Sequence, residues 1–400
     1  MQPKLYHPSE HDIDPTLIER EAITVINKLK QAGFAAYLVG GSVRDLLAKK
    51  TPKDFDISTS AKPEEIKSLF GRQCLLIGRR FRLAHIRFGH KILEVSTFRA
   101  GENTKEGELI TQDNIWGSEE EDVLRRDFTI NGLYYDPTNH TVIDYVGGWD
   151  DIKSSLLRTI GDPQVRFKQD PVRMIRLIKF RARFRFDISS DTKIALLKCL
   201  PEIIKSSPAR ILEEIFKMLE SGFSAPFFQL MADSGLLKLL FNKFHHRFNN
   251  PEGSHYPFLI AADHSNQKNP KHTLSRGLLT SALLFPVVDE RLQAMKAKGE
   301  SPHLGQIHTL CYDVIQEFLI NSFTHFPRKI LADAAMIITH QYRMTPVQGK
   351  THYSFRFLKS RDFADALLFL RLRAEADHEL IPIFESWREH YLKTKKEGHK

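Results

Sequence analysis

Two aspartates, Asp54 and Asp56, are the residues whose types and spacing most clearly suggest chemistry. They alternate with Phe55 and Ile57, a pattern typical of a β-strand, and residues i and i+2 of a strand point to the same face. Two carboxylates aimed at one point repel each other unless a positive charge lies between them. Hard oxygen ligands of this kind favour Mg²⁺. This DxD pair therefore predicts a magnesium site, although a DxD pattern alone is usually ordinary polar surface.

A glycine pair, Gly40 and Gly41, lies a short way before the DxD pair, in the stretch LVGGSVRD. A strand that ends in two glycines and opens a helix can cradle phosphate, because residues without a Cβ let backbone N–H groups approach closely. Arg44, in the first helical turn, can add a charge-assisted contact. A glycine pair is often only a tight turn. Beside the DxD pair, however, it supplies what two-metal nucleotidyl transfer requires.

Apolar spacing divides the chain into an α/β part and a helical part. Up to about residue 150, helices alternate with short strand patterns, and these are expected at 14–32 (helix), 36–39 (strand), 42–47 (helix), 54–57 (strand), 62–70 (helix), 83–88 and 92–98 (hairpin), and 133–135 and 142–145 (strand pair). Helical periods dominate afterwards, at 171–184, 191–200, 208–219, 225–240 and beyond. We predict an α+β chain with a mixed-sheet head (1–155), a helical neck (156–225) and a helical body and tail (226–400).

Bulk composition indicates a polyanionic partner. The 400 residues carry a formal net charge of +9, which suits nucleic acid, a nucleotide or an anionic membrane, although many basic proteins simply have solvated charges. The three cysteines form no disulfide framework. The N-terminus lacks a signal pattern, and the longest apolar stretch, 277–288, is shorter than the ~20 residues that span a bilayer. We therefore expect a soluble cytoplasmic protein without disulfides or a membrane partner; the sequence gives no oligomeric state.

Four stretches in order resemble the class II nucleotidyltransferases of the polymerase-β superfamily, the family of bacterial poly(A) polymerases and CCA-adding enzymes. They are LVGGSVRDLL (38–47), DFDIST (54–59), RRDFTIN (125–131) and DPVRMIR (170–176). The resemblance covers roughly residues 35–220 and fades in the helical C-terminal half. It implies a polymerase-β-like catalytic head, followed by a neck that binds the nucleotide base and RNA and a body that binds RNA.

The resemblance also implies roles for individual residues in the head. Asp54 and Asp56 would bind the catalytic metals, expected to be Mg²⁺. Asp127 would complete the acidic site or orient the nucleotide. Glu94 is either a third carboxylate near the metals or a partly exposed strand residue, and it is not included in the predicted site. The triphosphate and ribose of ATP would be held by Gly40, Gly41, Arg44 and Arg126.

In the neck, Asp170 and Arg173 would read the base edge through hydrogen bonds, with Arg176 and Lys179 near the phosphates. Asp170, Arg173 and Arg176 follow one another at i, i+3 and i+6, close to one stripe of a helix. A carboxylate accepts from an amino group and arginine donates to ring nitrogens, so the pair can distinguish bases without a template. The later basic residues of this helix could equally face RNA or solvent. Gln169 stands where the family often has Glu, which bears on base selectivity.

A basic stretch, LIGRRFRLAHI (76–86), resembles the poly(A) polymerase branch of the family, as does DNIWGS (113–118). Its arginines suit sequence-tolerant phosphate contacts with an RNA 3′ end. The alternative is a hairpin whose exposed side happens to be basic. The predicted RNA-binding residues are Arg79, Arg80 and Arg82.

These observations predict template-independent addition of adenosines from ATP to RNA 3′ ends. Two alternatives remain. The nearer is a CCA-adding tRNA nucleotidyltransferase, which shares the catalytic head. The farther is a non-catalytic RNA-binding protein on a degenerate head. The intact DxD pair argues against the latter, because paired carboxylates without a metal would hinder RNA binding.

Overall fold

The computed structural model describes residues 2–78, 83–101, 115–320, 323, 326–345 and 353–397. The chain forms two compact units, Met1–Glu202 and Ile203–Lys400. Across the described ranges, each helix falls short of the length or the apolar character needed to cross a membrane. The finer division into head, neck and body at residues 155 and 225 remains a prediction.

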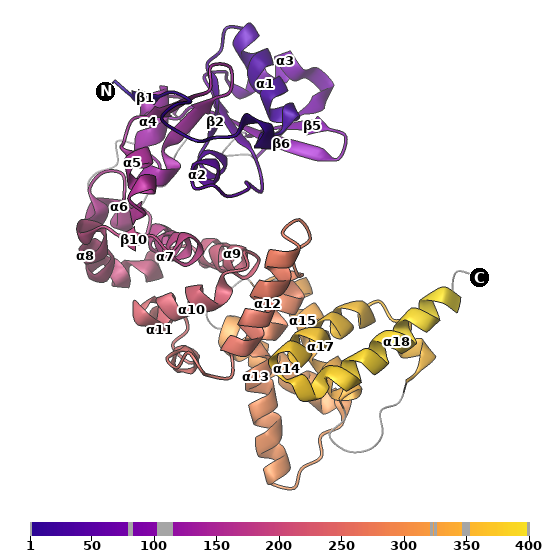
Figure 1. Cartoon of the computed structure of the whole chain (residues 1–400). Coiled ribbons are helices and arrows are strands. Elements are labelled where there is room, and N and C mark those ends of the chain that lie inside the picture. The colour runs from indigo at the N-terminus through magenta and orange to yellow at the C-terminus, as the bar shows by residue number, and fades with distance from the viewer. Residues whose placement is uncertain are drawn as a thin grey trace. The chain divides into compact units, whose positions relative to one another are not determined.

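An eight-stranded mixed sheet forms the centre of the first unit (Figure 1), with the order β1-β8-β7-β2-β3-β6-β5-β4. The central neighbours β3 and β6 are parallel, whereas the other neighbouring strands are antiparallel. The strands are β1 (Lys4–Tyr6), β2 (Ala36–Val39), β3 (Asp56–Thr59), β4 (Cys74–Ile77), β5 (Leu83–Phe88), β6 (Lys91–Thr97), β7 (Leu133–Asp136) and β8 (Thr141–Asp144). The edge strands β1 and β4 were not predicted, because their pairing with β8 and β5, rather than a sequence pattern, makes them strands.

Helices surround this sheet and follow it in the chain. They are α1 (Arg20–Gln31), α2 (Gly41–Leu47), α3 (Pro63–Phe70), α4 (Glu119–Leu124), α5 (Gly148–Lys153), α6 (Pro163–Gln169), α7 (Val172–Phe184) and α8 (Ser190–Cys199). The predicted first helix begins later than expected. Asp14 caps only the short 3₁₀ turn Pro15–Leu17, and extended backbone at Ile18 and Glu19 separates that turn from α1.

The region after the sheet contains two further short strands that the prediction of a purely helical neck missed. β9 (Leu156–Leu157) and β10 (Asp187–Ile188) form a two-residue parallel pair. Such a pair leaves no periodic pattern in the sequence, so helical signals dominate the region. The α+β fold class is confirmed: a mixed-sheet head comes first and helices account for most of the remainder.

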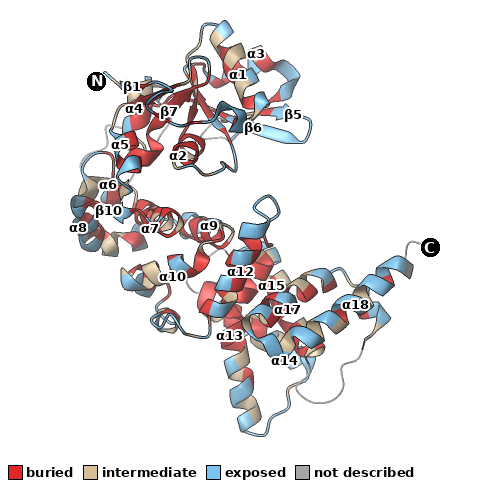
Figure 2. Cartoon of the chain, in the orientation of Figure 1, coloured by how far each residue is buried: buried red, intermediate tan, exposed pale blue. Residues whose placement is uncertain are grey.

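The second unit is helical. Its helices are α9 (Pro208–Leu219), α10 (Ser224–Asp233), α11 (Leu236–Leu240), α12 (Tyr256–Lys268), α13 (Arg276–Ala297), α14 (Leu304–Ile315), α15 (Arg328–Met344), α16 (Phe355–Leu358), α17 (Phe363–Ala376) and α18 (Ile381–Glu397). The single helix predicted at 225–240 is two helices, because Gly235 adopts φ +84° between them. Figure 2 shows that the first half of α13 is buried and its second half is largely exposed, so the apolar stretch 277–288 belongs to the core.

Candidate active site

The turn between β2 and α2 depends on Gly40. Its backbone angles, φ +65° and ψ −117°, lie in a region that residues with side chains rarely adopt. A Cβ at this position would also lie 3.3 Å from Nη1 of Arg126. At Gly41, the atom nearest to such a Cβ would be Nη2 of Arg44, at 3.7 Å. Two arginines therefore lie beside the glycine pair, while phosphate binding there remains a prediction.

The structure brings the DxD pair to this glycine turn. Asp56 opens β3 and pairs with Val39, the last residue of β2. Asp54 lies two residues before the strand, so the strand begins later than the predicted 54–57. Both aspartate side chains are exposed, and the charge of Asp54 acts on the carboxylate of Asp56. The two carboxylates are thus close to each other and to Gly40.

The pKa of Asp56 is raised to about 6. The largest cause is desolvation: the side chain reaches solvent, yet protein surrounds the carboxylate on enough sides to penalise its charge. The negative charges of Glu94 and Asp54 raise the pKa further, and Arg126 opposes them. Negative charge therefore accumulates at this end of the sheet, which is the setting in which a bound cation stabilises carboxylates.

Glu94 is the carboxylate whose place the sequence left open. β6 runs parallel to β3 with Val95 beside Ile57, which puts Glu94 next to Asp56. Its side chain is half exposed, and Oε1 lies 3.4 Å from Nε2 of His85 on β5. The structure places Glu94 beside Asp56 and leaves it partly exposed, so both alternatives remain open. Sequence alone does not find this contact, because the parallel pairing joins strands that are distant in the chain.

Asp54 and Asp56 have the donor chemistry that a hard divalent cation requires. Protein sites for Mg²⁺ commonly use one or two carboxylates, with phosphate and water oxygens completing the shell. Within the described ranges, no three or more His, Cys, Asp or Glu side chains form a ready-made metal cluster. The residues fit a metal that arrives with the nucleotide, and the identification of that metal as Mg²⁺ remains a prediction.

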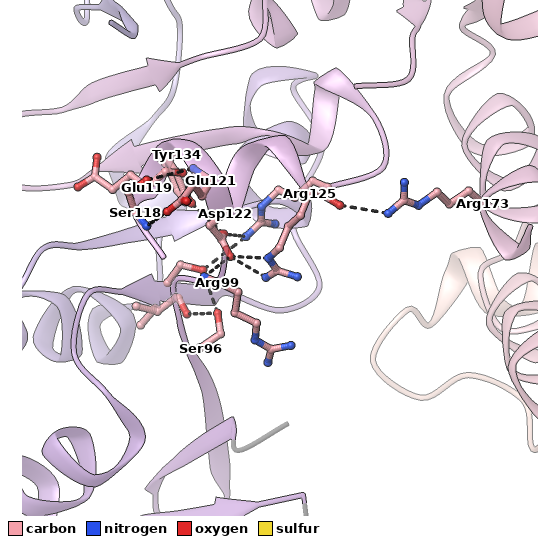
Figure 3. A network of polar contacts seen from close by, with 12 residues as sticks. Ser96, Arg99, Ser118, Glu119, Glu121, Asp122, Arg125, Tyr134 and Arg173 are labelled. Carbon is pink, nitrogen blue, oxygen red and sulfur yellow. Dashed lines mark hydrogen bonds and ion pairs between the residues drawn. The ribbon is translucent and has the colours of Figure 1, made fainter. Parts of the chain in front are cut away.

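A buried carboxylate, Asp122, organises the region behind the glycine turn (Figure 3). It accepts hydrogen bonds from Arg125 at 2.9 and 2.6 Å, from Arg126 at 2.7 Å and from the Tyr134 hydroxyl at 2.8 Å. The backbone N–H of Arg99 donates to it at 3.2 Å. Desolvation alone would raise the pKa of Asp122, but the charges of Arg126 and Arg125 lower it to about 2. Asp122 is therefore ionised and holds Arg126 beside Gly40.

The structure joins Asp127 to arginine rather than to the DxD pair. Its carboxylate lies 2.7 Å from Nη2 of Arg176 and accepts from the Asn131 amide and the Phe128 N–H, both at 2.9 Å. Although desolvation opposes it, the charge of Arg176 and the Asn131 hydrogen bond lower the pKa of Asp127 to about 2. These contacts favour the orienting role predicted for Asp127 over a place among the metal ligands; both remain untested predictions.

Arg44 is buried, with its guanidinium engaged by protein. It donates to Asp45 at 2.7 Å and to the Asn131 side chain at 2.5 Å. The guanidinium carbon lies 4.8 Å from the ring centroids of Phe180 and of Phe184 on α7. Arg44 thus connects α2 to α7. Its guanidinium lies next to Gly41, and from there it would contact the triphosphate as predicted.

The predicted base-reading residues lie where α6 meets α7. Nε of Arg173 is 3.9 Å from Asp170, which ends α6. Nη2 of Arg173 donates to the carbonyl of Arg125 at 3.1 Å, as Figure 3 shows, and Nη2 of Arg166 donates to the same carbonyl at 2.6 Å. Asp170 precedes α7 instead of lying on it, so the predicted stripe begins with Arg173. Sequence reasoning did not single out Arg166.

The predicted roles of two other groups remain untested. Nζ of Lys179 lies 5.4 Å from the ring centroid of its neighbour on α7, Phe180. The predicted RNA-binding residues Arg79, Arg80 and Arg82 lie outside the described residues, as does the start of the stretch 113–118.

Comparison with known proteins places this geometry in a family. Residues 36–158 match the poly A polymerase head domain, 185–248 match the probable RNA- and SrmB-binding site of polymerase A, and 311–400 match the polymerase A arginine-rich C-terminus. The poly(A) polymerase I of Escherichia coli O157:H7 is 35% identical over 396 residues, covering 95% of this chain and 84% of that protein. The chain belongs to the poly(A) polymerase family.

The poly(A) polymerase family is a branch of the class II nucleotidyltransferases, and CCA-adding enzymes of that group also match. The CCA-adding enzyme of Streptococcus gordonii is 37% identical over 221 residues, covering 55% of each chain. The crystal structure of the Bacillus stearothermophilus CCA-adding enzyme in complex with CTP has a TM-score of 0.67 at 24% identity, covering 94% of this chain and 82% of that one. The predicted family and enzyme class are confirmed, and this last likeness shows the fold.

Proposed function

We propose that this nucleotidyltransferase adds adenosine residues from ATP to RNA 3′ ends without a template, releasing pyrophosphate. The observation that carries the proposal is the extent of the two likenesses. A poly(A) polymerase I matches over 95% of this chain, through the helical second unit, whereas a CCA-adding enzyme matches over 55%. The arginine-rich C-terminal model matches in the same unit, at residues 311–400.

In the proposed reaction, the RNA 3′-oxygen forms a bond to the α-phosphorus of ATP, the bond to pyrophosphate breaks and the hydroxyl proton is released. Asp54 and Asp56 would hold Mg²⁺, which when bound activates the hydroxyl and neutralises the triphosphate. Glu94 adds negative charge beside them. Because Asp56 opens β3 and Glu94 lies beside it on β6, the sheet holds these carboxylates in place, and catalysis would depend mainly on positioning and electrostatics.

The phosphates would bind at the Gly40–Gly41 turn. Arg126 is held there by Asp122, so one positive charge already lies beside the backbone that would approach the ligand. Arg44 lies under the same turn, and Arg176 and Lys179 would extend the positive charge along α7. Fixed charges of this kind stabilise an anionic transition state without reorganising during the reaction.

The base would be selected by Asp170 and Arg173. Arg173 is buried and anchored to the carbonyl of Arg125, which limits the directions in which its other N–H groups can donate. A carboxylate next to a fixed donor can distinguish the amino group and ring nitrogen of adenine. The helical neck and body, with Arg79, Arg80 and Arg82, would bind RNA through phosphates.

The CCA-adding alternative is kept because of the shared fold and the 37% identity over 221 residues. It requires selectivity that changes from C to A during one round. The other alternative, a non-catalytic RNA-binding protein on a degenerate head, is disfavoured by the likeness to nucleotidyltransferases and by the intact DxD pair.

One assay separates the two enzymatic candidates. Purified protein and Mg²⁺ are incubated with a generic RNA and, separately, with tRNA lacking its CCA end, and one labelled nucleotide is offered at a time. Long ladders from ATP alone on the generic RNA are the expected result. Addition limited to two C and one A on the tRNA would assign the CCA-adding activity, and incorporation of neither kind would reject both candidates.

A further inference from the structure

A cavity of about 420 Å³ lies in the second unit, far along the chain from the catalytic motifs. Its walls come from α15, from the residues around α16 and from the start of α17. Small-molecule sites in proteins typically enclose roughly 300–1,000 Å³, so the cavity has room for a nucleotide unit. We call it the α15–α17 pocket.

Two arginines line the α15–α17 pocket, Arg343 on α15 and Arg356 on α16. The guanidinium carbon of Arg343 lies 4.0 Å from the ring centroid of Phe357, a buried residue in a cluster with Trp387. Arg343 is therefore held in place by the core, while Arg356 is exposed. Asp362 is the acidic residue among the lining side chains. The lining carries more positive than negative charge.

Hydroxyl groups accompany the arginines. Ser354 and Ser360 both line the pocket. Oγ of Ser360 is shielded from solvent and has no hydrogen-bond partner among the described residues. That atom is closed to a water-sized probe, so Ser354 supplies the hydroxyl that a molecule in the pocket can reach. Hydroxyl donors next to guanidinium groups form the contacts that phosphate oxygens accept.

A histidine, His340, completes the lining. Burial lowers the pKa of His340 to about 4, against the opposing effect of Asp362. The imidazole is therefore neutral near pH 7 and can donate one hydrogen bond and accept another. The positive charge of the pocket thus resides on the two arginines, which bind anions at any physiological pH.

We propose that the α15–α17 pocket binds a phosphate group through Arg343, Arg356 and the Ser354 hydroxyl. The phosphate belongs either to an RNA chain or to a free nucleotide. If RNA supplies the phosphate, the pocket helps to hold the RNA strand, and this reading rests on the proposed function. The pocket belongs to the second unit and contains none of the DxD residues, and we expect it to affect how firmly a substrate is retained rather than the transfer step.

Binding to the full-length chain, without metal or transfer, tests the proposal. The dissociation constants of a labelled 20-nucleotide oligo(A) and of AMP are measured in EDTA for the wild type and for Arg356→Gln. We expect Arg356→Gln to weaken one of the two ligands roughly fivefold to tenfold. For oligo(A), the slope of log Kd against log salt should also fall by about 0.7, the value for one phosphate contact with a single strand.

Arg361→Gln is the matched control, because it removes the same charge from an exposed neighbour that does not line the pocket. Asp362→Asn removes the opposing charge and should tighten binding roughly twofold. These opposite signs distinguish a ligand site from a general loss of structure, and thermal melts establish that all three variants fold.

Weaker oligo(A) binding by Arg356→Gln supports the RNA source, and weaker AMP binding alone supports the free nucleotide. Unchanged affinity for both ligands, or an equal loss in Arg361→Gln, would overturn the proposal. A wild-type chain that bound no oligo(A) would instead count against the proposed function, and the AMP measurement would still decide on the pocket.

Discussion

Two groups of carboxylates in the same unit have opposite surroundings. Desolvation raises the pKa of all three carboxylates compared here, Asp56, Asp122 and Asp127. Arginine partners reverse this effect for Asp122 and Asp127, whose pKa values fall to about 2. At Asp56, the negative charges of Glu94 and Asp54 add to the effect of desolvation, and the pKa rises to about 6. Protein partners neutralise the first group, whereas the second gathers like charges, the setting in which a bound cation would be stabilising.

This difference separates structural acids from candidate catalytic ones. Removing a carboxylate that compensates buried arginines leaves those charges without a partner, so the fold should suffer. Removing a carboxylate that is repelled by its neighbours should change the free energy of unfolding little but should strongly reduce the rate of nucleotide transfer. The predictions below test this contrast, beginning with the largest expected effect.

Asp56→Ala should reduce nucleotide transfer by roughly a thousandfold or more, because a metal ligand and its charge are lost. Asp54→Ala should behave in the same way. The melting temperature should stay within a few degrees of the wild type. Rates of ATP incorporation into RNA, measured beside thermal melts, give both quantities. Normal activity in either variant would refute the assigned role of the DxD pair.

Asp122→Asn should destabilise the first unit by about 3–5 kcal/mol, because Arg125 and Arg126 lose a buried counter-charge. The measurement is chemical denaturation with a probe in the sheet. Asp150→Asn is a suitable control, since it alters an exposed ion pair with Lys153 that contributes little. Equal stability of the two variants would show that Asp122 is not the organising residue.

Gly40→Ala should destabilise the fold by about 1–3 kcal/mol and also lower activity, because the added methyl meets Arg126 in a strained backbone. Gly33→Ala is the matched control: its φ is +89°, but no atom lies within 4 Å of the new Cβ. Gly33→Ala should therefore show the backbone strain without the loss of activity. Activity lost equally in both variants would argue against a special role of the Gly40 turn.

The smallest effect is a difference in pH dependence. The raised pKa of Asp56 means that its contribution to folding is favourable in acid and is lost as pH rises from about 4 to about 6. The lowered pKa of Asp122 means that its contribution is present above about pH 4 and is lost as pH falls toward 2. Solvent screening limits the Asp56 effect to at most about 1 kcal/mol.

Unfolding free energies of the wild type, Asp56→Asn and Asp122→Asn between about pH 2 and 7 measure these slopes. Relative to the wild type, Asp56→Asn should gain stability as pH rises, whereas Asp122→Asn should lose it. Slopes of the same sign would show that the two groups of carboxylates do not differ as described.

Local features of the fold could be predicted from the sequence, because they depend on nearby residues. The glycine turn, the hairpin of β5 and β6 and most of the long helices follow from patterns within a few positions. The break at Gly235 was missed because a single glycine is tolerated in many helices. The edge strands were missed because tertiary pairing, rather than periodicity, makes them strands.

The site was predictable in composition but not in its connections. Asp54, Asp56 and the glycines are close in the sequence, and the pairing of β2 with β3 brings them together in the structure. The proximity of Glu94 depends on the parallel pairing of β3 with β6. The pairing of Asp127 with Arg176 depends on where α7 packs. Neither could be read from residue types, since each joins segments whose separation in the chain carries no pattern.

The carbonyl of Arg125 receives hydrogen bonds from both Arg166 and Arg173. Arg166 also donates to the carbonyl of Arg126. The stretch that positions Arg126, the proposed phosphate-binding arginine, is thus held by a segment about 40 positions later. A chimaera that takes residues 125–131 from a CCA-adding relative and keeps 163–176 from this chain would combine parts fitted to different partners. Altered nucleotide choice therefore has to be engineered, or inherited, in both segments together.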